Sequence, residues 1–327
     1  MASAAAPVTS VFVFGVPYHA ARIARGLNSR GTSVHATYVT PRGYGRLLAM
    51  PPRSGRVVIM RVGFRVGAAT VRGRLFDAFW SRLRRALPDA LACHFWLGTD
   101  VLDTVREARS GRLRSAALLS ARGDLHLAVA PWLTSELNGV GLRALTTLLP
   151  PAHEGPSTAP PLPVDFGVLT YAPTERFGFY GGNAVLEASR RMPEIRFDIL
   201  GGRGQATRSE ANVHWHGWVE DVGRMFANAT VVVRVPQHDG YGNTVLEGLL
   251  YARHVVYTQE VPFTRRVWPV TANALVAVLE ELRDAHSAGQ LQANIEGRAY
   301  VREEFQSAKL LDRLIALIET SAAAGTG

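Results

Sequence analysis

The stretch TVVVRVPQHDGYGNTVLEGLL, residues 230–250, contains the local patterns that decide the fold. Its β-branched beginning predicts a strand buried on both faces, which is typical of a parallel sheet. The glycine-containing turn that follows leads into a helix that begins near Asn243. A strand that passes through a short loop into a helix is the repeating unit of α/β proteins with parallel sheets.

The same alternation runs through the rest of the chain. In the first half, the sequence predicts strands at 10–16, 32–39, 56–62, 90–96, 115–121 and 125–131, and helices at 18–31, 73–87, 100–110 and 131–141. In the second half, it predicts strands at 166–172, 195–200, 212–218, 230–236 and 254–258, helices at 182–192, 222–229 and 242–252, and a helical tail from residue 271.

A proline-rich segment divides the two halves and indicates an interdomain linker or hinge. We therefore predict an N-terminal Rossmann-like domain at 1–150, a linker at 151–164, a second domain at 165–305 and a C-terminal helix at 306–327. Each domain is expected to be α/β, with a doubly wound parallel sheet. The two should face a cleft at the carboxyl ends of their strands, where such folds bind ligands.

Composition excludes several classes of protein. The chain has 327 residues, is 47% hydrophobic and contains one cysteine, so an internal disulfide framework is excluded. The N-terminus lacks the basic region and apolar run of a signal peptide, and no uncharged apolar stretch reaches the roughly 18 residues of a membrane span. These features predict a cytoplasmic protein.

Positive charge is concentrated in the first half of the chain. Residues 1–150 contain 20 Arg against 7 Asp plus Glu, and 41–85 contain 11 Arg and a single acid, Asp77. Such a stripe attracts anionic lipid headgroups, phosphorylated acceptors or nucleic acid. Compositional bias is the alternative, since Lys309 is the only lysine of the chain. No known nucleic-acid-binding module is visible, so nucleic acid is not an expected partner.

The opening stretch also predicts an anion site. The helix N-terminus at Gly242, Asn243 and Thr244 offers N–H groups and a positive dipole end, which suit a diphosphate. Glu247, about one turn into the helix, can reach the hydroxyls of a ribose, and Asp239 can hold the group beyond the diphosphate. The alternative is structural: Asp239 stabilises the turn and Glu247 lies on the surface.

These residues resemble the Glu–seven residues–Glu motif of retaining GT-B glycosyltransferases, the family-4-like group called glycosyl transferases group 1. Here the motif consists of Asp239, Gly240, Tyr241 and Gly242, followed by Glu247, with Asp in place of the first Glu. The segments at 196–204 and 212–236, and the closing helices, are similar to that family in order and spacing. The resemblance covers most of 165–320 and, more weakly, 85–150.

The resemblance implies further donor-side residues. The family uses an Arg and a Lys to neutralise the diphosphate; Arg176 fills the arginine position, whereas Tyr180 stands where the lysine would be. Arg203 is then the candidate for the second cation. The backbone at Trp218 and Val219 is expected to meet the base. The implied catalytic residues are Asp239, Arg176 and Glu247, with no cofactor and no metal.

The acceptor side departs more from the family pattern. Its glycine-rich loop is reduced to FGVPYH at 14–19, which contains Gly15. Its His-Gly-Ser/Thr-Asp element is present as residues 97–100, with leucine at the histidine position and Asp100 at the end. His94 and His126 are the candidate replacements for the histidine. All four candidates on this side are weaker than those on the donor side.

The resemblance implies a hexosyltransferase-type glycosyltransferase (EC 2.4). It would move a sugar with retention from a nucleoside-diphosphate-sugar to a saccharide or lipid-linked acceptor. The arginine-rich first domain suggests envelope polysaccharide or glycolipid assembly at an anionic membrane surface. Two alternatives stay open: a GT-B nucleotide-sugar epimerase, and a nucleotide-sugar-binding protein without transferase activity.

Overall fold

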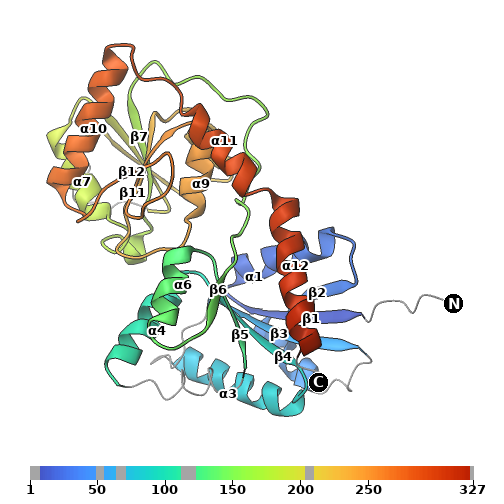
Figure 1. Cartoon of the computed structure of the whole chain (residues 1–327). Helices are drawn as coiled ribbons and strands as arrows, with labels where there is room; N and C mark the ends of the chain where they lie inside the picture. The colour runs from blue at the N-terminus through green and yellow to red at the C-terminus, as the bar shows by residue number, and fades with distance from the viewer. Residues whose placement is uncertain (1–7, 49–54, 64–70, 112–122, 203–209, 325–327) are drawn as a thin grey trace. The chain divides into compact units, whose positions relative to one another are not determined.

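The computed structural model describes residues 8–48, 55–63, 71–111, 123–202 and 210–324. The chain divides into two compact units, each with one six-stranded sheet (Figure 1). Unit 1 consists of Met1–Leu149 and Ser307–Gly327, and unit 2 consists of Pro150–Gln306. The chain thus leaves unit 1 for unit 2 and returns to unit 1 for its last helix.

The sheet of unit 1 is parallel, with strand order β2-β1-β3-β4-β5-β6. Its strands are β1 (Thr9–Gly15), β2 (Val34–Tyr38), β3 (Arg56–Val62), β4 (Leu91–Trp96), β5 (Leu125–Ala128) and β6 (Ala144–Thr146). The order reverses between β1 and β3, as in doubly wound folds.

Helices of unit 1 pack on this sheet in two groups. One group contains α1 (Pro17–Ser29) and α12 (Ser307–Ala324), which contact each other as well as the sheet. The other contains α2 (Tyr44–Leu48) and α3 (Val71–Ala86), whose aromatic residues join Phe14 of β1 in a core cluster. The remaining helices are η1 (Pro41–Gly43), α4 (Thr99–Arg109) and α6 (Pro131–Asn138).

The sheet of unit 2 is also parallel, with strand order β12-β11-β10-β7-β8-β9. Its strands are β7 (Gly167–Tyr171), β8 (Arg196–Leu200), β9 (Val213–Gly217), β10 (Val231–Arg234), β11 (His254–Tyr257) and β12 (Arg265–Arg266). The central strand β10 is the valine run that opened the sequence analysis, and its valines are completely buried. Here the order reverses between β7 and β10.

Helices of unit 2 also form two groups. Helix α7 (Gly182–Arg191) packs against α10 (Ala272–Ser287), and α9 (Asn243–Leu250) packs against α11 (Ile295–Glu304). The short helices η2 (Thr174–Arg176) and α8 (Val222–Ala227) follow β7 and β9, respectively. The core between the sheet, α7 and α10 is aliphatic, with Phe197 as its largest fully buried member.

The predicted fold class, two doubly wound parallel sheets in an α/β protein, is confirmed. The predicted strand at 115–121 lies outside the described residues. The sequence did not predict β6 and β12, which are short strands of three and two residues. The helical tail from residue 298 is interrupted at Phe305, whose buried ring packs against Tyr241 and Tyr300, so α11 and α12 are separate helices.

The proline-rich segment is fixed onto unit 2. The fully buried Arg253 donates hydrogen bonds to the carbonyl oxygens of Pro160 (3.1 Å) and Pro161 (2.9 Å). Arg298 donates a further bond of 2.6 Å to the carbonyl of Pro156. Prolines have no N–H of their own, so these carbonyls are the only backbone hydrogen-bonding groups that they offer. The segment predicted as a linker is therefore held against unit 2 along its length.

Candidate functional site

The helix α9 begins where the sequence placed it, directly after the loop that follows β10. Gly242 is the N-cap residue and carries no side-chain cap, and its carbonyl accepts from the N–H of Val245 at 2.9 Å. The start of α9 lies at the carboxyl end of β10, next to the reversal of strand order. Gly242, Asn243 and Thr244 thus lie at the edge of the sheet where a ligand is expected.

Glu247 lines a cavity within unit 2. The cavity has a volume of about 310 Å³ and is lined by His153, Glu154, Gly155, Pro156, Glu220, Asp221, Val222, Gly223, Phe226, Glu247 and Tyr251. Glu247 is only 6% exposed, so it is a buried carboxylate rather than a surface one. Its Oε1 lies 3.9 Å from Nε2 of His153, which comes from the proline-rich segment. Buried acids of this kind are rare outside paired or functional positions.

Asp239 is paired with Arg234, a residue that the sequence analysis did not select. Nε and Nη2 of Arg234 both donate to Oδ2 of Asp239, at 2.9 and 2.7 Å. The N–H of Gly240 donates to the other oxygen of Asp239 at 3.1 Å. Burial opposes the charge of Arg234, but Asp239 and the neighbouring tyrosines offset this effect, and the pKa of the guanidinium is raised. The guanidinium of Arg234 is therefore charged at every physiological pH.

The guanidiniums of two arginines lie over aromatic rings at this site. The guanidinium of Arg234 lies 4.5 Å from the ring centre of Tyr180 and 5.5 Å from that of Tyr171. The guanidinium of Arg176 lies 4.0 Å from the ring of Phe179 and 5.6 Å from that of Tyr180. Tyr180, which occupies the family's lysine position, thus contacts two arginines, since each lies within the range of a cation–π interaction.

The motif loop is packed closely around the ion pair. A Cβ on Gly242 would lie 3.0 Å from Oδ2 of Asp239 and 3.2 Å from Nε of Arg234. Glycine is thus required at position 242 because of space, since its backbone is extended. The hydroxyl of Tyr257, at the end of β11, donates to the carbonyl of Gly240. These contacts fix the loop that carries Asp239.

The other predicted donor residues have separate environments. Tyr241 packs its ring edge-on against Phe305, with ring centres 5.1 Å apart. Trp218 follows β9 and is 81% exposed, whereas the adjacent Val219 is partly buried and directly precedes the cavity-lining residues 220–223. Arg203 lies outside the described residues. The structure thus places Asp239 and Gly242 beside Arg234, gives Arg176 and Arg234 the shared neighbour Tyr180, and places Glu247 one helical turn further along α9.

On the acceptor side, Gly15 and Asp100 lie at carboxyl ends of strands in unit 1. Gly15 ends β1 with a positive φ of 125°, and a Cβ there would collide with the carbonyl of Val62 in the neighbouring strand. Asp100 is buried, and its Oδ1 accepts from the backbone N–H groups of Gly98 (2.7 Å) and Leu97 (3.1 Å). Burial raises the pKa of Asp100, opposed by these hydrogen bonds. Its carboxylate thus holds the loop that leads into α4.

His94 and His126 lie side by side within the sheet of unit 1. They face each other on β4 and β5, with ring centres 5.0 Å apart, and each is 2% exposed. Nε2 of His94 lies 3.0 Å from Oδ2 of Asp124, and Nδ1 of His126 accepts from the indole N–H of Trp96 at 3.2 Å. Burial lowers the pKa of His126 to about 3, and it lowers the pKa of His94 as well. Both rings are therefore neutral and packed in the core.

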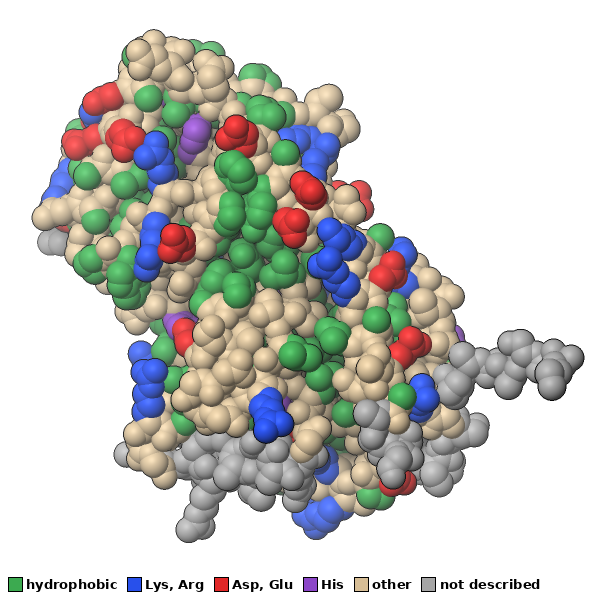
Figure 2. Space-filling view, viewed as in Figure 1, with side chains coloured by type: hydrophobic (Ala, Val, Ile, Leu, Met, Phe, Trp, Pro, Cys, Tyr) green, Lys and Arg blue, Asp and Glu red, His purple; other side chains and the backbone are tan. Residues whose placement is uncertain are grey.

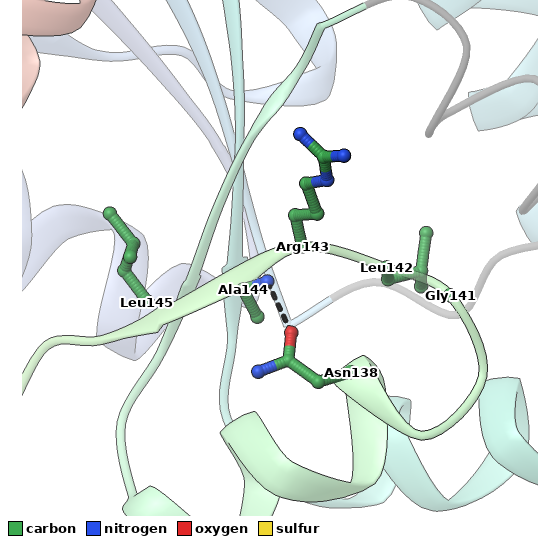
Figure 3. A pocket seen from close by; sticks show the side chains of 6 residues that line it. All are labelled: Asn138, Gly141, Leu142, Arg143, Ala144 and Leu145. Atoms are coloured by element: carbon green, nitrogen blue, oxygen red, sulfur yellow. Dashed lines mark hydrogen bonds between the residues drawn. The ribbon is translucent and has the colours of Figure 1, made fainter.

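A larger hollow in unit 1 contains none of the predicted site residues. It measures about 520 Å³ and lies at the turn between α6 and the edge strand β6. Figure 3 shows Asn138 below the turn, where its Oδ1 accepts from the N–H of Ala144 at 2.8 Å, and Arg143 extending away from it. The exposed Arg143 is the one charged side chain among the lining residues. Chemistry therefore places the candidate site in unit 2, despite the greater volume of this hollow.

Two functional features were missed by the sequence analysis. Arg234 had a signal, because a charged residue inside a buried valine strand requires a partner. His153 and the residues that follow it had no comparable signal, since a proline-rich segment predicts only a linker. Their place in the cavity wall depends on hydrogen bonds from Arg298, which is distant in the sequence.

Comparisons with known proteins give a family match within unit 2. Residues 182–286 match the family model of glycosyl transferases group 1, and these residues include Asp239, Gly242 and Glu247. No curated protein matches the sequence. Among solved structures, HepE of Anabaena, in complex with UDP-glucose, aligns with a TM-score of 0.67 at 11% identity, covering 95% of this chain and 99% of that chain.

Two further solved structures have the same fold. WaaG, described as a glycosyltransferase involved in lipopolysaccharide biosynthesis, aligns with a TM-score of 0.61 at 13% identity, covering 95% of this chain and 99% of that one. TarM aligns with a TM-score of 0.56 at 12% identity, covering 80% of this chain and 54% of that one. The present chain thus spans about half the length of TarM. At these identities, the likeness shows the fold.

The fold and the family match support the same conclusion as the motif. The chain has the GT-B fold, and its residues 182–286, which carry the motif, match the model of glycosyl transferases group 1.

Proposed function

We propose that the protein transfers a sugar from a nucleoside-diphosphate-sugar to an acceptor hydroxyl, with retention at the anomeric carbon. The observation that carries the proposal is the position of Glu247, a buried acid in the wall of a cavity and one turn from the uncapped start of α9. A helix start binds phosphate, and a carboxylate beside it binds the hydroxyl pair of a ribose. The cavity volume of about 310 Å³ suits a nucleoside.

The proposed reaction is a substitution at the anomeric carbon of the donor sugar. The bond between the anomeric carbon and the diphosphate oxygen breaks, and its electron pair goes to the diphosphate. A bond to the acceptor oxygen forms on the same face, and the proton of the acceptor hydroxyl passes to the departing diphosphate. Arg176 and the N–H groups at the start of α9 stabilise the negative charge that develops. We propose that these groups, rather than a metal or another cofactor, supply that stabilisation.

The names of two solved structures support a class of donor and acceptor. HepE was crystallised with UDP-glucose, and WaaG is described as acting in lipopolysaccharide biosynthesis. Together they support a nucleoside-diphosphate-sugar as donor and a saccharide or lipid-linked acceptor in cell-envelope assembly.

The surface of unit 1 supports a membrane-associated acceptor. Its exposed arginines include those at positions 25, 42, 46, 82, 85, 106 and 109. Within the described residues, none of the helices has the length and apolarity of a membrane span. On the face of unit 1 in Figure 2, Lys and Arg side chains stand singly among uncharged ones, which suits diffuse attraction to anionic headgroups rather than a built pocket. We propose peripheral binding to the inner face of the membrane.

Thermal stabilisation by nucleotides tests the donor site. A ligand that binds the native state raises its stability, so one member of a panel of UDP, GDP, ADP and TDP is expected to raise the unfolding temperature. Glu247→Ala should lose most of that shift. Glu281→Ala, which changes an exposed glutamate of α10 in the same unit, is the matched control and should retain it. No shift with any nucleotide at millimolar concentration would contradict the proposal.

Product analysis then tests transfer. With donor and a membrane-derived acceptor, NMR should show the anomeric configuration of the donor in the product. An epimerase would instead change the donor when no acceptor is present, and a binding protein would give no turnover. Sedimentation with anionic and neutral liposomes at low salt tests the proposed membrane binding. We expect the protein to bind the anionic vesicles alone.

A further inference from the structure

We propose that Arg234 supplies the second positive charge at the diphosphate of the donor, in place of the lysine that the chain lacks at position 180. The inference rests on the proposed function and names a residue of the same site. Asp239 is then the positioning residue that orients the guanidinium of Arg234.

The position of Arg234 in the sheet is the first argument. Arg234 is the last residue of β10, and Tyr171 is the last residue of β7. These two strands are neighbours where the strand order of unit 2 reverses. Ligands of open parallel sheets bind at the carboxyl ends of strands at such a reversal. A charge at the end of an otherwise all-valine strand thus stands where the ligand is expected.

The hydrogen bonds of Arg234 leave one side of its guanidinium available. Nε and Nη2 donate to Oδ2 of Asp239, at 2.9 and 2.7 Å. Within the described ranges, Nη1 makes no hydrogen bond to another residue. A guanidinium has five N–H donors in a planar fork, so three remain, two of them on Nη1. Since the side chain is 7% exposed, a narrow edge of it reaches the surface.

The neighbours of Arg234 are those of a diphosphate site. Its Nε would lie 3.2 Å from a Cβ on Gly242, so the guanidinium is adjacent to the N-cap of α9. Tyr180 is a neighbour of both Arg234 and Arg176, with its ring centre 4.5 and 5.6 Å from the two guanidiniums. Two arginines therefore lie beside the residue that replaces the lysine, and one of them, Arg234, adjoins a helix start.

Arginine suits this place better than lysine. Its guanidinium is less strongly hydrated than an ammonium, and its flat faces pack against aromatic rings. The guanidinium of Arg234 lies over two such rings, those of Tyr171 and Tyr180. The lone lysine of the chain, Lys309, belongs to unit 1, so it is not a substitute within unit 2.

The test compares two ligands on one protein. We would measure by calorimetry the Kd of a nucleoside and of its diphosphate, using the base selected by the thermal panel. The ratio of the two Kd values reports the contribution of the diphosphate alone. For Arg234→Met this ratio should fall about 10- to 100-fold, because a hydrogen bond to a charged group is lost. Arg191→Met, at an exposed arginine of α7, should leave the ratio unchanged.

The ratio separates a binding role from a structural one. Loss of folded protein lowers both affinities and leaves their ratio unchanged, so an unchanged ratio in Arg234→Met would overturn the inference. If that variant does not fold, Arg234→Gln, which can still donate to Asp239, is measured in the same way, and an unchanged ratio has the same meaning. Wild-type protein that binds neither ligand would instead overturn the proposed function.

Discussion

Arg30 and Asp312, which are 282 positions apart in the sequence, form a bidentate ion pair with Nε–Oδ1 and Nη2–Oδ2 distances of 2.7 and 2.9 Å. The pair joins the turn after α1 to α12, so the last helix of the chain belongs to the first structural unit. Both partners are partly exposed, and ion pairs of that kind contribute about 0–1 kcal/mol. The stability of this contact must therefore come from the apolar face of α12.

We predict that packing, rather than charge, holds α12 in place. Leu314→Ala should lower the free energy of unfolding of unit 1 by about 2–5 kcal/mol, because Leu314 is 1% exposed and its loss leaves a cavity. Asp312→Asn, which removes the ion pair, should lower it by much less, because water screens an exposed pair. Urea unfolding of both variants measures the difference. Equal losses of unfolding free energy in the two variants would show that the ion pair stabilises the contact as much as the packing does.

Gly242 is predicted to tolerate no side chain. In Gly242→Ala the new Cβ would approach Asp239 and Arg234 to 3.0 and 3.2 Å, so the ion pair must shift. We expect a loss of about 1–3 kcal/mol in stability, as for other overpacked sites, and weaker binding of nucleoside diphosphates. Gly167→Ala is the control, because the nearest atom to its Cβ would be 3.7 Å away. Calorimetry and urea unfolding of the two variants should therefore differ, and matching results would contradict the close packing.

The buried histidine pair predicts a pH dependence. Burial lowers the pKa of His126 to about 3, against about 6.5 in the unfolded chain. Between these values the unfolded state binds a proton that the folded state does not, so stability falls as the pH falls below about 6.5. At pH 5 the loss due to His126 is about 2 kcal/mol.

His126→Gln should reduce this dependence, because glutamine keeps an acceptor for the indole N–H of Trp96 but does not titrate. The measurement is the difference in unfolding free energy between pH 7 and pH 5. His35→Gln, at an exposed histidine of β2, is the control and should keep the wild-type difference. An unaltered pH dependence in His126→Gln would show that His126 is not the titrating group.

The proline-rich segment is predicted to depend on a buried arginine. Arg253→Met removes two hydrogen bonds to the carbonyls of Pro160 and Pro161 and should destabilise unit 2 by about 1–3 kcal/mol. It should also make 150–163 more susceptible to proteolysis. Arg302→Met removes bonds to the same segment from an exposed arginine and should have a smaller effect. If both variants are cleaved like the wild type, the segment is held by other contacts.

Most of the fold could be predicted from the sequence because its signals are local. The valine run of β10, the loop that follows it and the start of α9 are patterns within 21 residues, and all three are found as predicted. The short strands β6 and β12 could not be predicted, because two or three residues carry no period and exist only through pairing with a neighbour.

The site was predictable to a smaller extent. Asp239, Gly242 and Glu247 follow from one motif, whereas the partner of Asp239 depends on how the loop folds back on its own strand. Arg176, in η2, and Arg234, at the end of β10, share Tyr180 as a neighbour, a contact that no spacing in the sequence shows. The environments of His94 and His126 depend on the register of β4 with β5, which the sequence leaves open.

The anchoring of the proline-rich segment has a consequence for how the chain is connected. The first residues after the boundary at Leu149, from His153 to Pro156, form part of the cavity wall beside Glu247. The same few residues therefore closely follow one of the two chain crossings between the units and form one side of the cavity beside Glu247. A ligand that fills this cavity would contact a segment of chain that begins at a boundary between the two units.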